Sequence, residues 1–221
     1  MILIEIGDFL KENYQKILDK IIQDNEKKGV IPRLLMHSCC APCSSYCIEY
    51  LSNFFDITLF FYNPNISYAE EFDKRAKELT RLVNSMKLTR PVNVVIEHYE
   101  PNEFYNVAKG LEDEPERGRR CEKCFYLRLN ESAKYAKEHS FDFFTTTLSI
   151  SPHKDAQLLN NIGRELSSTH NIPYLYSDFK KKNGYKRSIE LSNEFNLYRQ
   201  NYCGCIYSYK ESLMSTRGKC D

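Results

Sequence analysis

Short apolar runs alternate along this chain with longer segments in which apolar residues recur at helical spacing. The runs are rich in β-branched and aromatic residues, and they predict strands at residues 31–36, 56–62, 92–97 and 141–147, with a short strand near 173–176. The longer segments predict helices at residues 7–28, 44–53, 70–87, 101–109, from about 125 to 138, 155–168 and from about 188 to 198. Beyond residue 205 the pattern indicates a polar tail.

This order of elements predicts an α/β fold. Strands that alternate with helices over this length form a parallel, doubly wound, Rossmann-like sheet with helices on both faces. No linker or repeat divides the chain, so we expect one domain at residues 31–221 with a helical extension at residues 1–30. Ligands of such folds bind at the carboxyl ends of the strands. We therefore expect three turns to meet at one edge, at residues 39–40, 63–65 and 145–151.

The composition is globular, with 221 residues of which 42% are hydrophobic and 28% charged. The net charge of +1 gives no global basic field, although a local basic surface is still compatible with nucleic-acid binding. Glu5 and Asp8 argue against a signal peptide, and no stretch is apolar enough to span a membrane. We therefore expect a cytoplasmic protein whose thiols stay reduced.

Four of the nine cysteines lie directly after the first predicted strand, at positions 39, 40, 43 and 47. A second group, Cys121 and Cys124, opens a predicted helix, whose N-terminus lowers the pKa of a thiol. Together with Cys39 and Cys40, this pair supplies four sulfur ligands for zinc or for an iron–sulfur cluster. The adjacent cysteines favour a cluster, which offers separate irons to separate sulfurs, over zinc or unliganded thiols.

The remaining cysteines have other predicted roles. Cys43 and Cys47 lie one helical turn apart, and we weigh packing as small buried residues against a further metal site or an electron relay. Cys220 is expected to be a dispensable free thiol. A disulfide between Cys203 and Cys205 would close a very small, strained ring that is easily reduced. The pair therefore suits redox cycling, with two ordinary thiols as the alternative.

Two basic segments neighbour the cysteine motifs in the sequence, and tyrosines are interleaved with the second segment. Cations combined with aromatic rings can hold a single-stranded RNA loop and stack a splayed base. His37, at the end of the first predicted strand, is either a proton donor or a hydrogen-bonded strand-end histidine. Against the alternative of a solvated charged face, we expect RNA contacts from Arg119, Arg120, Lys180, Lys181, Lys182, Lys186 and Arg187.

Taken together, the motifs resemble those of the epoxyqueuosine reductase family QueH. They run in order from about residue 33 to 208 and read HSCCAPCS (37–44), FYNPNI (61–66), GRRCEKC…LRL (118–129), TTLSISPHKD (146–155) and YRQNYCGCIYS (198–208). The resemblance implies a Rossmann-like fold of the HUP type, which also occurs in tRNA-thiolating enzymes. It implies reduction of epoxyqueuosine to queuosine at the wobble position of tRNA, the last step of queuosine biosynthesis, without cobalamin.

The resemblance also implies site residues. It places the ligands of a [4Fe–4S] cluster on Cys39, Cys40, Cys121 and Cys124, and a redox-active pair on Cys203 and Cys205. The reaction removes the epoxide oxygen and consumes two electrons. We expect an iron, of the cluster or an additional iron beside it, to polarise that oxygen. The electrons would come through the cluster or from the cysteine pair, which an unidentified electron donor renews.

Two alternatives remain at this point. A zinc-stabilised, non-catalytic RNA-binding module would use the same four cysteine ligands but leaves the pair at 203 and 205 unexplained. A nucleotide-dependent, tRNA-modifying enzyme of the same fold would need a glycine-rich phosphate-binding turn after the first strand. Residues 38–43 contain no glycine, which counts against that second alternative.

Overall fold

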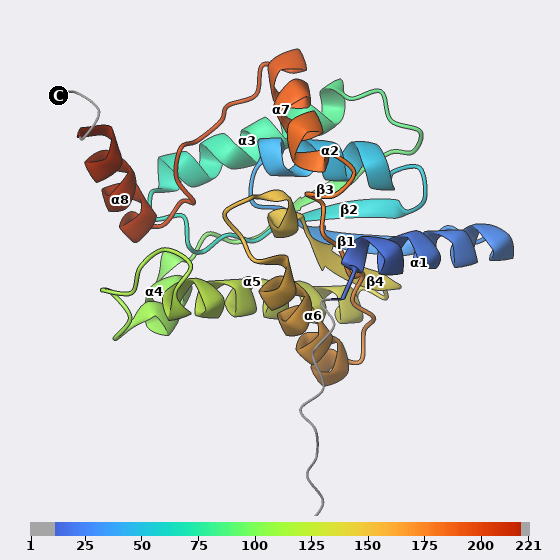
Figure 1. Ribbon diagram of the computed structural model, residues 1–221, viewed down its shortest axis with the longest axis horizontal. Coiled ribbons are helices and arrows are strands. Elements are labelled where there is room, and N and C mark those ends of the chain that lie inside the picture. Colours follow the sequence, from blue (N-terminus) through green and yellow to red (C-terminus); the bar gives the residue numbers. More distant parts are fainter. Residues whose placement is uncertain (1–11, 218–221) are drawn as a thin grey trace, which may run out of the picture.

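A parallel four-stranded sheet lies at the centre of the computed structural model, which describes residues 12–217 of the chain (Figure 1). The strand order is β3–β2–β1–β4, and in that order the bounds are Asn93–Ile96, Asp56–Phe61, Arg33–His37 and Phe143–Thr146. Every neighbouring pair is parallel, as where Leu35 lies opposite Thr58 of β2 and Phe144 of β4. The predicted α/β fold with a parallel sheet is confirmed.

The run at residues 173–176 is not a full strand. It forms an isolated bridge between Tyr174 and Phe144. Hydrogen bonds join Phe144 to Pro173 and Leu175, but Pro173 has no N–H with which to extend the ladder.

Side chains on successive strand positions enter two different cores, because they point to opposite faces of the sheet. On β2, Leu59 belongs to one buried cluster and Phe60 to the other. One face is covered by α2 (Ala41–Leu51), α3 (Ala69–Ser85) and α7 (Gly184–Glu194), and the other by α5 (Arg119–Glu138) and α6 (Ala156–His170) (Figure 1). The short helix α4 (Pro101–Ala108) follows β3, and the 3-10 turn η1 (Thr147–Ile150) follows β4.

Helix α1 (Tyr14–Lys28) packs on the first of these cores through Leu18 and Ile22. The predicted helix began at residue 7, but the side chain of Asn13 caps the helix by accepting a hydrogen bond from the N–H of Lys16. Residues 7–11 of that prediction lie outside the described part. Within residues 12–217, no helix is long and apolar enough to cross a membrane.

The polar tail predicted after residue 205 is wrong, since residues Ile206–Arg217 form helix α8. The sequence pattern missed it because its apolar residues do not gather on one face. The helix starts where the backbone N–H of Ile206 donates a 2.8 Å hydrogen bond to Ser67 Oγ. Cys220 lies outside the described residues.

Candidate functional site

The carboxyl ends of the strands meet at one edge of the sheet, and the strand order reverses there between β1 and β4. The chain turns from β1 into α2 through Cys39 and Cys40. Asn63, which follows β2, donates a 2.9 Å hydrogen bond to the backbone of that turn. His37 at the end of β1 lies 2.9 Å from the hydroxyl of Thr146 at the end of β4. The predicted meeting of the three turns is confirmed.

His37 is buried, and both of its ring nitrogens have partners. Nδ1 shares a hydrogen bond with Thr146, and Nε2 lies 3.2 Å from the carbonyl oxygen of Tyr62. Burial, followed by the nearby charge of Arg128, lowers the pKa of His37 to about 3, so the ring is neutral. Of its two predicted roles, the hydrogen-bonded strand-end histidine is the one that this geometry supports.

Three thiols crowd the N-terminus of α2. The Sγ atoms of Cys39, Cys40 and Cys43 all lie within 4.8 Å of one another, and those of Cys39 and Cys40 are 3.8 Å apart. Two thiolates bound to one tetrahedral ion at 2.3 Å lie about 3.8 Å apart. Hydrogen bonds from Cys39 and Cys43 hold the pKa of Cys40 well below its ordinary value, which prepares it for ligation. This triad could therefore hold a metal ion.

Cys47 lies one turn further along α2 and has a different setting. It is buried, and its thiol donates to the carbonyl of Cys43. Burial raises its pKa well above the ordinary value, so it stays a neutral thiol. This is the setting expected for a small interior residue.

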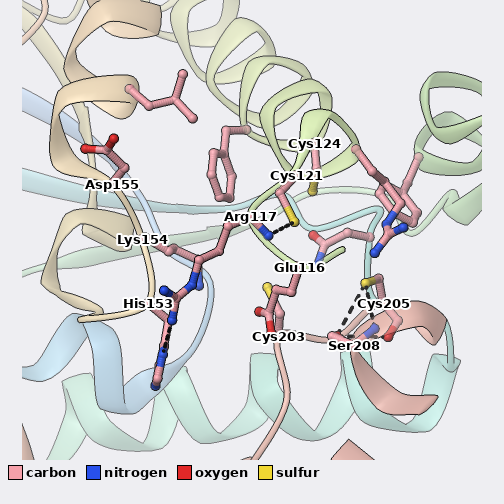
Figure 2. Close-up of a pocket in the computed structure, with 15 residues that line it drawn as sticks. Glu116, Arg117, Cys121, Cys124, His153, Lys154, Asp155, Cys203, Cys205 and Ser208 are labelled. Carbon is pink, nitrogen blue, oxygen red and sulfur yellow. Dashed lines mark hydrogen bonds between the residues drawn. The ribbon is translucent and has the colours of Figure 1, made fainter. Parts of the chain in front are cut away.

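A second set of thiols surrounds a cavity of about 70 Å³. Figure 2 shows Cys121 and Cys124, on the first two turns of α5, facing the segment that carries Cys203 and Cys205. Burial raises the pKa of Cys124 to about 12 and also raises the pKa values of Cys121 and Cys205. These thiols therefore stay protonated at neutral pH and lose their protons only when they bind a metal or are oxidised.

The segment with Cys203 and Cys205 is held in place by the start of α3 and the loop before it. Gly204 has φ 130°, a backbone conformation that favours glycine, and its carbonyl accepts a 3.1 Å hydrogen bond from the N–H of Ser67. Arg75 donates a 2.9 Å hydrogen bond to the carbonyl of Cys203. Both thiols are free in this structure.

A larger hollow of about 610 Å³ adjoins this cavity and reaches the triad of Cys39, Cys40 and Cys43. Five residues line both spaces, which are therefore adjacent compartments of one site: Glu116, His153, Lys154, Cys203 and Ser208. The four predicted cluster ligands lie around this region. Cys39 and Cys40 belong to the buried cluster that Cys121 contacts, and Arg128 lies close enough to Cys39, Cys121 and Cys124 for their charges to affect it.

Two buried guanidinium groups lie behind the thiols. Arg75 is 2% exposed and pairs with Glu71 at 2.7 Å, and Arg128 is 1% exposed and donates to the carbonyl of Cys124 at 3.2 Å. In each, Nη2 finds no hydrogen-bond partner within the described residues. Sequence reasoning missed both residues, because an arginine on an amphipathic helix carries no local sign that it will be buried. Their fixed positive charge favours thiolates or another anionic group at the site.

These observations test the iron–sulfur group that the motifs imply. A thiol-only donor set backed by buried cations suits a metal centre with thiolate ligands, and carboxylate-preferring ions do not match it. Zinc and iron–sulfur clusters share thiolate ligation. The residues therefore fit the implied group, and the kind of metal is part of the proposal below.

The residues predicted to contact RNA have several settings. Arg120 is buried and donates to the carbonyls of Leu111 and Glu112, and Lys180 donates to the carbonyl of Ser149 at 2.7 Å. The others that have partners form ion pairs, Arg119 with Glu114, Lys182 with Asp19, and Arg187 with Glu49. Two are exposed and have no side-chain partner within the described residues, Lys181 and Lys186.

The rim of the larger hollow presents polar residues that the sequence analysis did not select. They include Arg199, Gln200 and His153, together with the exposed ring of Tyr185 and the ring of Tyr202. The sequence shows that these two tyrosines are interleaved with the second basic segment. Only the fold brings them to the larger hollow that the cysteines also line.

Comparisons with known proteins show the family of this chain. A family model described as epoxyqueuosine reductase QueH matches residues 34–211. The epoxyqueuosine reductase QueH of Staphylococcus epidermidis is 46% identical over 202 residues, covering 90% of this chain and 85% of the relative. That of Streptococcus pyogenes is 44% identical over 202 residues, covering 90% and 79%. That of Thermotoga maritima is 34% identical over 184 residues, covering 80% and 91%. The chain therefore belongs to the epoxyqueuosine reductase QueH family, which makes it an oxidoreductase.

Proposed function

We propose that this protein reduces epoxyqueuosine to queuosine in tRNA. The observation that carries the proposal is the placement of Cys203 and Cys205 across a cavity from Cys121 and Cys124 in a member of this family. The reaction breaks both carbon–oxygen bonds of the epoxide and forms a carbon–carbon double bond. Two electrons and two protons are consumed, and the oxygen leaves as water.

In this proposal, Cys39, Cys40, Cys121 and Cys124 hold a [4Fe–4S] cluster. Within the described residues the tight metal-binding group is Cys39, Cys40 and Cys43, without Cys121 or Cys124. A cluster tolerates that separation because its ligands bind different irons, and Cys43 remains as a ligand for an additional iron. When bound, the cluster supplies electron transfer and a Lewis acid for the epoxide oxygen.

Cys203 and Cys205 are the proposed electron donors within the chain. Oxidation of two thiols to one disulfide releases two electrons and two protons, the amounts that the reaction consumes. The hydrogen bonds from Arg75 and Ser67 hold the backbone of the pair at the cavity. A separate electron donor must reduce the disulfide after each turnover, and no cobalamin is required.

The larger hollow is the proposed entrance for the modified base of the tRNA anticodon loop. Its volume of about 610 Å³ is in the range of small-molecule sites, which suits one splayed nucleotide. Tyr185 and Tyr202 offer rings for stacking, and Arg199 offers a positive charge at the rim. The exposed Lys181 and Lys186 are the proposed phosphate contacts of the predicted basic set.

The same division into parts is proposed for the whole chain. Residues 31–221 form the reductase domain and residues 1–30 a helical extension, whose described helix is anchored on the core by Leu18 and Ile22.

A nucleotide-dependent enzyme of this fold would need a glycine-rich turn between β1 and α2. That turn carries Cys39 and Cys40 instead, which argues for thiol chemistry there.

The direct test is to purify the protein without oxygen and to measure iron, sulfide and zinc together with its visible spectrum. We expect about four irons and four sulfides per chain, and conversion of epoxyqueuosine to queuosine in tRNA by nucleoside mass spectrometry. tRNA that carries unmodified guanosine is the matched control. A colourless protein with stoichiometric zinc and no conversion after iron–sulfur reconstitution would replace the reductase with a zinc-stabilised RNA-binding module.

A further inference from the structure

Lys154 occupies a distinctive place, the wall between the two compartments of the site. It lies in the turn between η1 and α6. It lines the smaller cavity, which Figure 2 shows, and also the larger hollow, as Cys203 does. The ionisable groups that act on it most strongly are the thiols of Cys203, Cys39 and Cys43. Its side chain is thus close to both sets of cysteines.

The ammonium group of Lys154 has no acceptor of its own. No hydrogen bond or ion pair joins it to another described residue, and the next residue, Asp155, instead caps α6 by accepting a 2.8 Å hydrogen bond from the N–H of Gln157. Lys154 lines both compartments, so its ammonium can donate a charged hydrogen bond to an acceptor on a bound ligand.

The backbone that carries Lys154 is fixed. Its N–H donates to the carbonyl of Ser151 at 3.1 Å. Lys180 ties the same turn from the other side, donating to the carbonyls of Ser149 at 2.7 Å and Lys154 at 3.4 Å. A side chain on so rigid a turn is suited to fixing the position of a bound group.

The other cations around the cysteines are already committed. Arg120 bonds to loop carbonyls, and Arg117 donates to Nδ1 of His153 at 2.8 Å. Arg75 and Arg128 lie behind the thiols and line neither compartment. Lys154 is therefore the cation of the shared wall that is available to a ligand.

We propose that the ammonium of Lys154 donates a hydrogen bond to the epoxide oxygen of the substrate and stabilises the negative charge that develops on it. This inference rests on the reductase function proposed above. As each carbon–oxygen bond breaks, the bonding electrons move onto oxygen, and a preorganised positive charge there lowers the barrier. Lys154 remains protonated throughout, since the two thiols of Cys203 and Cys205 supply both protons of the water and both electrons.

The test compares four anaerobically purified, metal-loaded proteins: wild type, Lys154→Met, Lys154→Arg and the control Lys134→Met. Lys134 is exposed on α5 and pairs only with Glu131 on its own helix within the described residues. We expect Lys154→Met to lower the single-turnover rate about 100-fold while its iron content and visible spectrum stay those of the wild type. Lys154→Arg, which restores the charge, should have a single-turnover rate at least about tenfold higher than that of Lys154→Met.

A second measurement isolates the contact with oxygen. Enzyme whose Cys203–Cys205 pair has been oxidised binds without turnover, so affinities for epoxyqueuosine tRNA and for queuosine tRNA can be compared directly. The wild type should prefer the oxygen-bearing tRNA by about tenfold, the size of one hydrogen bond to a charged group. Lys154→Met should lose that preference and bind queuosine tRNA as the wild type does.

The outcomes separate the two proposals. Wild-type protein that cannot reduce epoxyqueuosine tRNA would overturn the reductase function itself. An active wild type with an equally active Lys154→Met variant would overturn only the role of Lys154. Loss of iron from both Lys154 variants would assign the residue to the metal site and would likewise overturn its contact with the substrate.

Discussion

Replacing Arg75 with Met removes a buried cation that joins α3 to the redox pair. The Arg75 side chain is 1% exposed and that of Glu71 is 12% exposed, and their ion pair is 2.7 Å long. Arg75 also donates to the carbonyl of Cys203 at 2.9 Å. The variant therefore leaves the Glu71 carboxylate without its cation and the Cys203 carbonyl without the donor Arg75.

The size of the effect can be worked out from these contacts. Breaking a fully buried ion pair from one side costs about 3–5 kcal/mol. Glu71 retains the hydrogen bond of the Tyr198 hydroxyl, whose single hydrogen is shared between the two carboxylate oxygens at 3.1 and 3.3 Å. This hydrogen bond and some exposure of Glu71 lower that cost to about 2 kcal/mol. The orphaned carbonyl adds about 1 kcal/mol, and removal of the unsatisfied Nη2 of Arg75 returns a similar amount. The net loss of unfolding free energy is about 2 kcal/mol.

Urea unfolding of metal-loaded wild type and Arg75→Met, at equal iron content, measures this loss. Glu71→Gln is the matched control, because it removes the carboxylate charge while keeping an acceptor for Tyr198. The double variant Arg75→Met/Glu71→Gln should lose less unfolding free energy than the two single variants added together, because it contains no unpaired carboxylate charge. An Arg75→Met variant within about 0.5 kcal/mol of wild type would refute the view that this pair holds the segment of Cys203.

Three further predictions concern turnover, RNA binding and pH. Replacing Cys203 with Ser should abolish multiple turnover while leaving tRNA affinity unchanged, and full multiple turnover in that variant would rule out the thiol pair as electron donor. The double variant Lys181→Ala/Lys186→Ala should weaken tRNA binding and reduce the salt slope of log K by about two; an unchanged slope would remove these lysines from the interface. The pKa of Glu78 is lowered by its hydrogen bonds from Arg81 and by the hydrogen bond from the N–H of Tyr198. Between the lowered pKa and the ordinary carboxyl pKa, the unfolded chain therefore binds more protons than the folded chain. Glu78→Gln should therefore cost about 1 kcal/mol at pH 7, and this cost should shrink as the pH falls through the lowered pKa, measured as the urea midpoint at each pH.

The ion pairs of the basic segments could not be predicted from the local sequence. Lys182 pairs with Asp19 and Arg187 with Glu49, residues more than 100 positions away in the sequence. A run of positive charge looks the same whether it faces RNA or carboxylates of its own chain. Pairing is decided by which elements pack together, here α7 on α2.

The sequence by itself determined the four strands of the sheet, most of the helices, the parallel arrangement and the gathering of the cysteine-bearing turns at one edge. These follow from periodicities of two and 3.6 residues and from the shared direction of parallel strands, which are local or nearly local properties. Only the tertiary structure decided that Arg75 and Arg128 are buried behind the thiols, that α8 forms, and that Lys154 stands unpaired between two compartments. Burial and pairing depend on neighbours brought from distant parts of the chain, so no local pattern encodes them.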